Sequence, residues 1–225
     1  MILGVLDTET TGLSKHKHRI IEVGIRVIED RQVQDAHYHQ YINPQQMVSP
    51  GAFAVHGISN EFLSDKPVFA DIADELADFI KNVDQLVIHN AAFDHPFLIM
   101  EFARCHGQVQ WLEKIAITDT LIMAREMYSG KNDLDSLCSR LGVNNSDRQL
   151  HGALKDADIL ADVYLAMTRT QASMSLALDN QADQLSALDA EIPNIMYDIE
   201  STDMASHIKW QEAYPSHRFQ EVTDS

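Results

Sequence analysis

The first strand that the sequence predicts ends in two carboxylates, and this feature constrains the fold more than any other. An apolar run from Met1 to Leu6 has the length of a buried strand, and Gly12 bounds it. Side chains alternate along a strand, so Asp7 and Glu9 project to the same face. Neighbouring carboxylates repel each other unless a cation neutralises them, and their oxygens suit Mg²⁺ or Mn²⁺. The pair indicates either a divalent-metal site or an exposed strand end whose acids face water.

The pattern of apolar residues predicts an α/β fold that opens with an antiparallel meander. Further strands are expected over residues 20–28, 36–42, 86–88 and 115–117. Helices are expected over residues 68–80, 94–105, 119–127, 134–141 and 153–167, whereas residues 50–67 show no clear periodicity. Helices that alternate with strands after a meander indicate a mixed sheet flanked by helices.

The charge balance restricts the function classes. The chain of 225 residues has a net charge of −17, with 34 Asp and Glu against 17 Lys and Arg. A stand-alone, tight, non-specific nucleic-acid binder would normally present a basic face, so this balance argues against one. An enzyme that handles nucleic acid through bound metal and with the help of a partner remains compatible with the charge.

Cysteine usage and hydropathy indicate the compartment. Cys105 and Cys138 form neither a disulfide framework nor a zinc spacing, so both are expected to be reduced and in or near the core. No targeting signal precedes the first strand, and no apolar run is long enough to span a membrane. We therefore expect a cytoplasmic protein with no membrane partner.

Beyond residue 170 the composition changes. The last 54 residues, from position 172 on, contain ten acidic residues and only two basic ones. Residues 171–202 are expected to form a flexible linker, and residues 203–225, with Trp210 and Tyr214, a tail that docks onto a partner. The alternative is a frayed terminus that packs on its own domain.

Two further acids stand at positions where an α/β sheet gathers ligands. Asp94 follows the predicted strand that ends at His89, and Asp156 lies in the first turns of the last predicted helix, five residues after His151. Ligands of α/β proteins collect at the carboxyl ends of strands. Each of the two acids could instead serve only to stabilise a helix N-terminus.

Together, these stretches resemble the three motifs of the DEDD exonucleases, in the subclass that adds a catalytic histidine. Asp7 and Glu9 match the first motif, Asp94 the second, and His151 with Asp156 the third. Among these enzymes, the amino-acid sequence is most similar to the sequences of proofreading exonucleases of replicative DNA polymerases. The similarity covers roughly residues 2–176. The resemblance implies a ribonuclease H-like exonuclease fold for residues 1–170 and 3′→5′ hydrolysis of DNA ends.

The resemblance also implies a two-metal mechanism. Two Mg²⁺ or Mn²⁺ ions about 3.5–4 Å apart activate water and stabilise charge on phosphorus. Asp7 is expected to bridge the ions, with Glu9 and Asp156 completing the first site and Asp94 holding the second. His151 is expected to take the proton from the attacking water. Five residues turn a helix about 140° off one face, so His151 should lie on the loop before the helix that carries Asp156.

Residues that flank the motifs are expected to contact the terminal nucleotide. The expected set is Thr8, Thr10, Thr11, Leu13, His56, Asn90 and Phe93. Leu13 and Phe93 are candidates to wedge or stack against the last bases, because stacking tolerates any sequence. Leu13 could equally be a core residue, and His89 could either orient the second motif or be a buried, hydrogen-bonded histidine.

The resemblance extends to partners. Gln171, Met174 and Leu176 resemble the Gln-led peptides that bind a sliding clamp, although a fraying helix end is the alternative. The expected partners are DNA 3′ ends, the polymerase catalytic (alpha) subunit, the clamp and a small accessory (theta-like) subunit. Tethering to a polymerase would explain the acidic charge, because effective concentration replaces intrinsic affinity for DNA.

Two other functions remain open at this point. An exoribonuclease that trims RNA ends would use the same fold and the same metal ligands. A replisome scaffold with a decayed nuclease belongs to a different class, and the presence of a carboxylate at every motif position argues against it.

Overall fold

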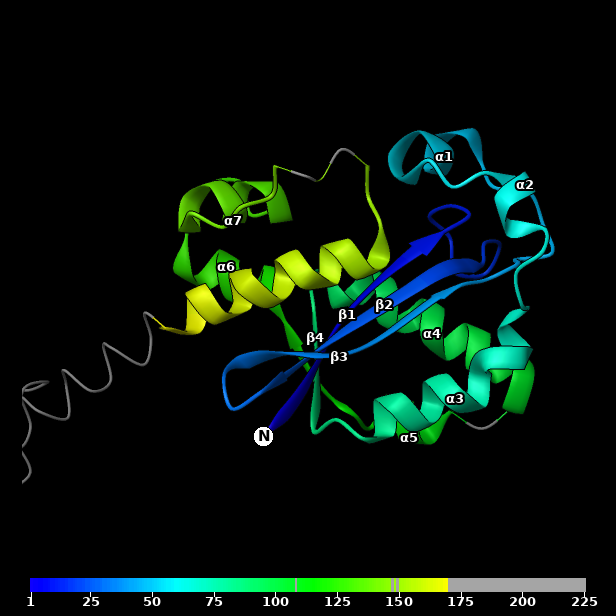
Figure 1. The fold of residues 1–225 in the computed structure, drawn as a ribbon, viewed down its shortest axis with the longest axis horizontal. Helices are drawn as coiled ribbons and strands as arrows, with labels where there is room; N and C mark the ends of the chain where they lie inside the picture. The colour runs from blue at the N-terminus through cyan, green and yellow to red at the C-terminus, as the bar shows by residue number, and fades with distance from the viewer. Residues whose placement is uncertain (108, 147, 149, 170–225) are drawn as a thin grey trace, which may run out of the picture. The chain divides into compact units, whose positions relative to one another are not determined.

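The computed structural model describes residues 1–107, 109–146, 148 and 150–169 (Figure 1). The predicted linker and docking tail, including Gln171, Met174 and Leu176, lie outside the described residues. Within the described part of the chain, no helix is both long enough and apolar enough to cross a membrane.

A five-stranded mixed sheet forms the centre of the fold, with strand order β3-β2-β1-β4-β5. The strands are β1 (Ile2–Thr10), β2 (Ile20–Glu29), β3 (Gln32–Tyr41), β4 (Gln85–Ile88) and β5 (Ala116–Asp119). The first three are antiparallel neighbours, and β4 and β5 run parallel to β1. The predicted meander and mixed sheet are confirmed, and the carboxyl ends of β1, β4 and β5 meet at one edge.

The helices largely match the predicted ranges. They are α1 (Pro50–His56), α2 (Asn60–Leu63), α3 (Phe69–Lys81), α4 (Ala91–His106), α5 (Gln110–Glu113), α6 (Thr120–Met127), α7 (Leu134–Leu141) and a last helix over residues 153–169. The helices α1, α2 and α5 were not predicted. They contain four to seven residues, which is too short for an apolar period to show. Serine caps at Ser49 and Ser59 start the first two.

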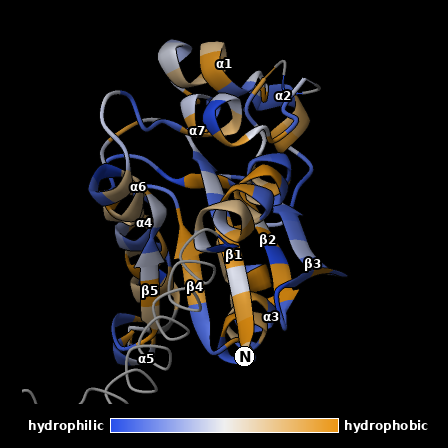
Figure 2. Ribbon diagram, turned by 90° about the vertical axis from the view of Figure 1, so that its left-hand side faces the viewer, coloured by the Kyte–Doolittle hydropathy of each residue, from blue (hydrophilic) through white to orange (hydrophobic). Residues whose placement is uncertain are grey.

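The sheet has an apolar core on each face, and strand alternation sorts the residues between them. Leu6 packs with α3, α4 and α5, whereas Leu3 and Val5 pack with α6, α7 and the last helix. Figure 1 shows the two helical layers on either side of the sheet, and Figure 2 shows that the central strands are largely apolar. Asp7 and Glu9 continue the series of Leu3 and Val5, so their side chains point toward the layer that contains the last helix.

The last helix lies unusually close to β2. A Cβ atom added at Gly24 would be only 2.2 Å from the backbone nitrogen of Leu154. The guanidinium of Arg26, also on β2, forms an ion pair with Asp158 at 2.6 Å. These contacts set the position of the first turns of the helix, and therefore of Asp156.

The cysteine prediction is also confirmed. Cys105 and Cys138 are both free thiols, the first half-buried and the second fully buried.

Candidate active site

A cavity of about 930 Å³ opens at the edge where the parallel strands end. All but one of the predicted site residues that the structure describes line it: Asp7, Thr8, Glu9, Thr10, Leu13, His56, Asn90, Phe93, Asp94, His151 and Asp156. Its volume lies within the ~300–1,000 Å³ that is usual for ligand pockets. Residues that are up to 149 positions apart in the sequence therefore share one cavity.

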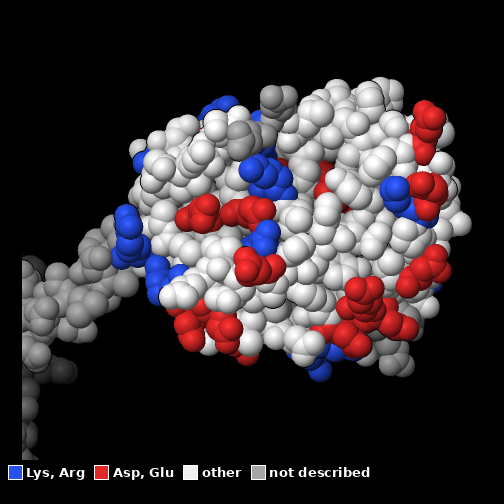
Figure 3. Space-filling model, in the orientation of Figure 1, with Lys and Arg blue, Asp and Glu red and all other residues white. Residues whose placement is uncertain are grey.

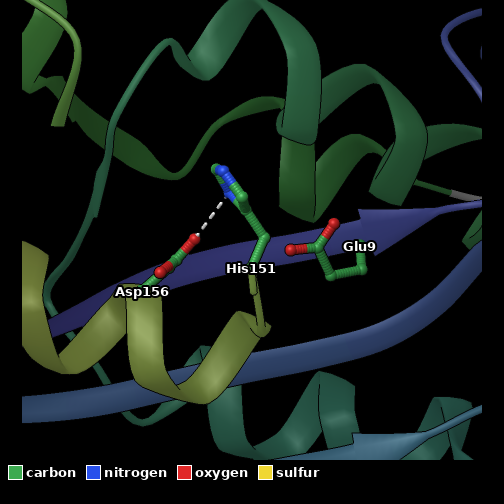
Figure 4. A group of neighbouring side chains, drawn as sticks. All are labelled: Glu9, His151 and Asp156. Atoms are coloured by element: carbon green, nitrogen blue, oxygen red, sulfur yellow. Dashed lines mark ion pairs between the residues drawn. The ribbon is translucent and has the colours of Figure 1, made fainter. Parts of the chain in front are cut away.

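The first and third motifs meet on one face of the sheet. Glu9 and Asp156 are buried, and one potential ligand atom from each of Glu9, His151 and Asp156 lies within 4.8 Å of the others (Figure 4). His151 precedes the last helix, on the loop, as predicted. Its Nδ1 atom lies 3.1 Å from Oδ2 of Asp156, and its side chain is 45% exposed.

The second motif approaches from the other side of β1. Asp94 lies in the first turn of α4 and is almost fully buried. Its Oδ1 atom accepts hydrogen bonds from the Thr8 hydroxyl at 2.6 Å and from the Thr8 amide at 3.1 Å. The carboxylate is therefore bonded to the strand that carries Asp7 and Glu9, which a helix-capping role alone would not require.

Arg148 was missed by the sequence analysis, although it is central to the cavity. Its Nε and Nη2 atoms donate to the two oxygens of Asp156 at 2.6 and 2.7 Å. Its Nη1 atom donates to Asp135 on α7 at 2.7 Å, and Nη2 also lies 2.9 Å from Nδ1 of His151. The available signal was a lone cation three residues before the motif histidine, and spacing alone does not show where its guanidinium lies.

The carboxylates raise one another's affinity for protons. Burial, together with the charges of Asp94, Asp156 and Glu9, raises the pKa of Asp7 well above its ordinary value. Burial raises the pKa of Glu9 to about 8, with the charges of Asp156, Glu22 and Asp94 adding to it. Burial likewise raises the pKa of Asp94 to about 7.

Asp156 behaves in the opposite way. Burial acts to raise its pKa, but the neighbouring His151 and the hydrogen bonds from Arg148 outweigh burial, so the pKa lies below its ordinary value. Of the four motif carboxylates, Asp156 is the one that forms an ion pair with Arg148, and it is also the one whose pKa is lowered. The chemistry of this oxygen-rich set fits a divalent cation, which would supply the same stabilisation to the other three acids.

Glu22 is a further buried acid that the sequence analysis did not single out. It lies opposite Glu9 in the β1–β2 register and is 2% exposed. Its Oε1 atom lies 2.7 Å from Nε2 of His39. Its position within an apolar strand run was the only signal in the sequence.

Most of the residues predicted to contact the nucleotide line the cavity, whereas Thr11 does not. Leu13 is 86% exposed at the cavity, so the alternative that it belongs to the core is wrong. Phe93 is half-buried and packs on Phe97 with ring centroids 5.1 Å apart. Thr10 donates its hydroxyl to the Gly12 carbonyl. These side chains line the cavity, with Leu13 the most open to a substrate.

Thr11 does not reach the cavity. It is fully buried, and its hydroxyl accepts hydrogen bonds from the Arg19 amide at 3.0 Å and from the Gln46 side chain at 2.7 Å. The same oxygen lies 3.0 Å from Nδ1 of His18. Thr11 therefore holds the loop after β1 together. The prediction that its side chain contacts the terminal nucleotide is wrong, because that side chain is buried away from the cavity.

Two histidines on the cavity wall are held by the protein. Nδ1 of His56 accepts a hydrogen bond from the Ile58 amide at 3.0 Å, and burial lowers the pKa of His56. Nδ1 of His89 lies 2.9 Å from the Thr120 hydroxyl, and burial lowers the pKa of His89 as well. Both rings are therefore favoured in the neutral form.

Asp119 supports the loop that leads to the second motif. Asn90 has a left-handed backbone with φ of 66°. The Asp119 carboxylate accepts from the amides of Asn90 at 3.1 Å and Ala91 at 2.9 Å, and also from the Leu121 amide at 2.9 Å. One carboxylate thus joins the end of β5 to the starts of α4 and α6, a role that the sequence did not reveal.

Comparisons with known proteins agree with this geometry. The family model RNase_T, described as Exonuclease, matches residues 5–164. The chain belongs to this exonuclease family. DNA polymerase III subunit epsilon of Escherichia coli K12 is 47% identical over 187 residues, which is 80% of this chain and 76% of that protein. The corresponding subunit of Rickettsia typhi is 44% identical over 196 residues, covering 85% of each protein.

Solved structures show the same fold. Exonuclease X in complex with 5′ overhanging duplex DNA matches with a TM-score of 0.58 and 24% identity, over 75% of this chain and 92% of that one. The zinc-bound E. coli exonuclease I–ssDNA complex matches with a TM-score of 0.66 and 19% identity, over 83% of this chain and 45% of that one. The expected exonuclease family and ribonuclease H-like fold are confirmed.

Proposed function

We propose that this chain is the proofreading 3′→5′ exodeoxyribonuclease subunit of a bacterial replicative DNA polymerase. It would remove mismatched 3′-terminal nucleotides as nucleoside monophosphates. The observation that carries this proposal is the gathering of all four motif carboxylates and His151 around one cavity. Similarity to epsilon subunits over most of the chain favours DNA over RNA as the substrate.

The metal ligands are assigned from the donor set. Asp7, Glu9, Asp94 and Asp156 would hold divalent ions, and hard carboxylate oxygens suit Mg²⁺ or Mn²⁺. The raised pKa values of Asp7, Glu9 and Asp94 support this assignment, because a nearby dication would restore their ionised forms. When bound, such ions supply an activated water and stabilise negative charge on phosphorus.

The protein's own groups position the reaction. His151 is the base that takes the proton of the attacking water, and its place on an exposed loop end gives the ring access to the cavity. Thr8 orients Asp94 through two hydrogen bonds. Buried groups of this kind keep the acids in place without reorganisation during the reaction.

Substrate binding would rest on few direct contacts. Leu13 at the cavity rim and Phe93 on its wall are placed to pack against the terminal bases in a sequence-tolerant way. His56 and Asn90 line the same cavity and would contact the terminal nucleotide. A proofreader must accept any base, so apolar packing suits its task. Mispaired ends unpair more readily and would therefore reach the site more often.

Partners would provide the affinity for DNA that the surface lacks. Figure 3 shows patches of Asp and Glu on this face with single Lys or Arg side chains beside several of them, and the chain as a whole has a net charge of −17. The polymerase catalytic (alpha) subunit would hold residues 203–225, and a sliding clamp would bind Gln171, Met174 and Leu176. A small accessory (theta-like) subunit would cover exposed strands. Deletion of residues 172–225 should abolish polymerase binding, and survival of binding would place the interface on the exonuclease domain.

Hydrolysis of defined 3′ ends tests the activity. Single-stranded, matched and mismatched DNA ends and RNA ends are incubated with Mg²⁺ or Mn²⁺ and the full chain. We expect metal-dependent release of deoxynucleoside monophosphates, fastest from frayed ends and lost in Asp7→Ala and His151→Ala. Glu126→Gln removes a carboxylate from the exposed surface of α6 and is the matched control.

The other outcomes separate the alternatives. Much faster cleavage of RNA than of DNA would assign the chain to the RNA-trimming exonucleases. A folded protein that binds Mn²⁺ but turns over neither substrate would be a scaffold with a decayed nuclease.

A further inference from the structure

The cavity contains a built-in cation. Among the described residues that line it, Arg148 is the only Lys or Arg, and six are acids: Asp7, Glu9, Asp94, Asp133, Asp135 and Asp156. The Arg148 side chain is only 7% exposed. A buried guanidinium that faces several carboxylates stabilises them electrostatically, as a metal ion in the same place would.

The guanidinium occupies both oxygens of one predicted metal ligand. Nε and Nη2 of Arg148 bond to Oδ1 and Oδ2 of Asp156 in the bidentate arrangement typical of strong Arg–carboxylate pairs. Each of these bonds takes one lone pair of its oxygen, and the guanidinium charge would repel a divalent ion that approached the same carboxylate. Direct metal binding by Asp156 is therefore favoured when Arg148 moves away. Arg remains protonated at any accessible pH, so release requires movement of the side chain.

A second acid offers an anchor for that movement. Asp135 on α7 accepts a bond from Nη1 of Arg148 at 2.7 Å, and its side chain is 60% exposed. It does not belong to the four carboxylates that match the exonuclease motifs. The guanidinium can therefore keep one bond while it leaves Asp156.

Arg148 also determines which ring nitrogen of His151 carries the proton. A guanidinium only donates hydrogen bonds, so the 2.9 Å contact uses the lone pair of Nδ1 and places the proton of the neutral ring on Nε2. A base that acts through Nε2 needs the opposite tautomer. The 3.1 Å contact between Nδ1 and Asp156 favours that tautomer once Arg148 has withdrawn.

We propose that Arg148 is a positioning residue that holds Asp156 and His151 as an internal counter-cation and gives up Asp156 when a divalent ion binds. The inference rests on the proposed function, because it assumes that Asp156 is a metal ligand. The metal affinity of the site is then set by exchange between the ion and the guanidinium. A residue that merely braced the loop before the last helix would have the opposite effect, because its loss would disorder the ligands and weaken metal binding.

Calorimetric titration of the full, EDTA-treated chain with Mn²⁺ tests the exchange. A hydrogen bond to a charged group is strong enough to change an equilibrium constant about tenfold. We expect Arg148→Gln to lower the Kd for Mn²⁺ by about tenfold or more and to lower the Tm of the metal-free protein. Arg148→Lys retains the charge without the bidentate geometry, so its Kd should lie between those of Arg148→Gln and the wild type.

Two further measurements keep the test decisive. Asp135→Asn retains the guanidinium on Asp156 and should not tighten Mn²⁺ binding. Imidazole ¹⁵N spectra of the metal-free protein should show His151 protonated on Nε2 in the wild type and shifted toward Nδ1 protonation in Arg148→Gln. If Arg148→Gln fails to fold, the Kd of Arg148→Lys decides the matter.

The possible failures are distinguishable. A wild type that binds Mn²⁺ and degrades DNA, with a Kd that is unchanged or raised in both Arg148 variants, would overturn the exchange and leave the proposed function intact. A wild type that binds no Mn²⁺ and degrades no nucleic acid would overturn both.

Discussion

In the metal-free protein, the free energy of unfolding should fall as the pH rises through neutrality. The cause is Glu9, whose pKa is raised from 4.5 to about 8 by burial and by the charges of Asp156, Glu22 and Asp94. Between these two values the folded chain holds a proton that the unfolded chain has released. Folding is therefore linked to proton uptake, and raising the pH opposes it.

The magnitude follows from the same two values. The window spans about 3.5 pH units, and each unit is worth about 1.4 kcal/mol, so Glu9 sets a ceiling of ~5 kcal/mol on the loss of stability. Asp7 and Asp94 interact with Glu9, so their protons titrate as a group and their effects do not simply add. A loss of this size is a large fraction of the ~5–15 kcal/mol that stabilises a typical domain.

Urea unfolding followed by circular dichroism measures the effect. The full chain is unfolded in EDTA at several values between about pH 5 and pH 8. The stability is expected to fall most clearly above about pH 6.5, because below it the lowered pKa values of His56 and His89 act in the opposite direction. Added Mn²⁺ should restore stability most at the alkaline end, because an ion binds the folded carboxylates and replaces their protons.

Matched variants separate the site from the general charge of the chain. Glu9→Gln should flatten the dependence on pH, whereas Glu126→Gln, which removes a carboxylate from the exposed surface of α6, should leave it unchanged. A stability in EDTA that stays constant or rises with pH would refute the reasoning. An equal slope in Glu9→Gln and the wild type would refute the assignment to this site.

Three further substitutions test single contacts of the site and of the fold. Gly24→Ala should destabilise the fold by about 1–3 kcal/mol in urea unfolding and reduce nuclease activity, because the new methyl group collides with the backbone of the last helix. Thr8→Val should lower activity or metal affinity by about 10–100-fold, because Asp94 loses its 2.6 Å hydrogen bond. Glu101→Ala should cost about 3 kcal/mol of unfolding free energy, because the fully buried Glu101 carboxylate binds Arg19 through two bonds.

Each of these has a control of similar chemistry. Gly51→Ala adds the same methyl group where nothing lies within 4 Å, and Thr8→Ser keeps the hydroxyl. Asp78→Asn removes an acid from an exposed ion pair with Lys81. Loss in a control equal to that in its partner variant would show that the proposed contact is not responsible.

Local pattern was sufficient to predict the main elements and the motif carboxylates. The bounds of α7, residues 134–141, agree with the prediction because an apolar face and the Gly142 stop both lie within one short segment. Asp7 and Glu9 lie on one face because alternation is a property of any strand. His151 lies on the loop before the last helix, as its spacing of five residues from Asp156 predicted.

The remaining features depend on contacts that no local pattern contains. Glu22 stands beside Glu9 only because of the strand register, and Arg148 reaches Asp156 only because of the course of one loop. Thr11 was predicted to face the substrate, but contacts with Gln46 and His18 turn it into a loop support.

The sequence by itself thus determined the fold class, the exonuclease motifs and the chemical character of the site, because periodicity and residue type act over a few neighbouring positions. Only the tertiary structure decided which acid carries a cationic partner and how close the last helix lies to Gly24. It also decided that a single carboxylate, Asp119, joins three elements. These outcomes depend on distances between residues that are remote in the chain, and such distances are set by packing of the whole core.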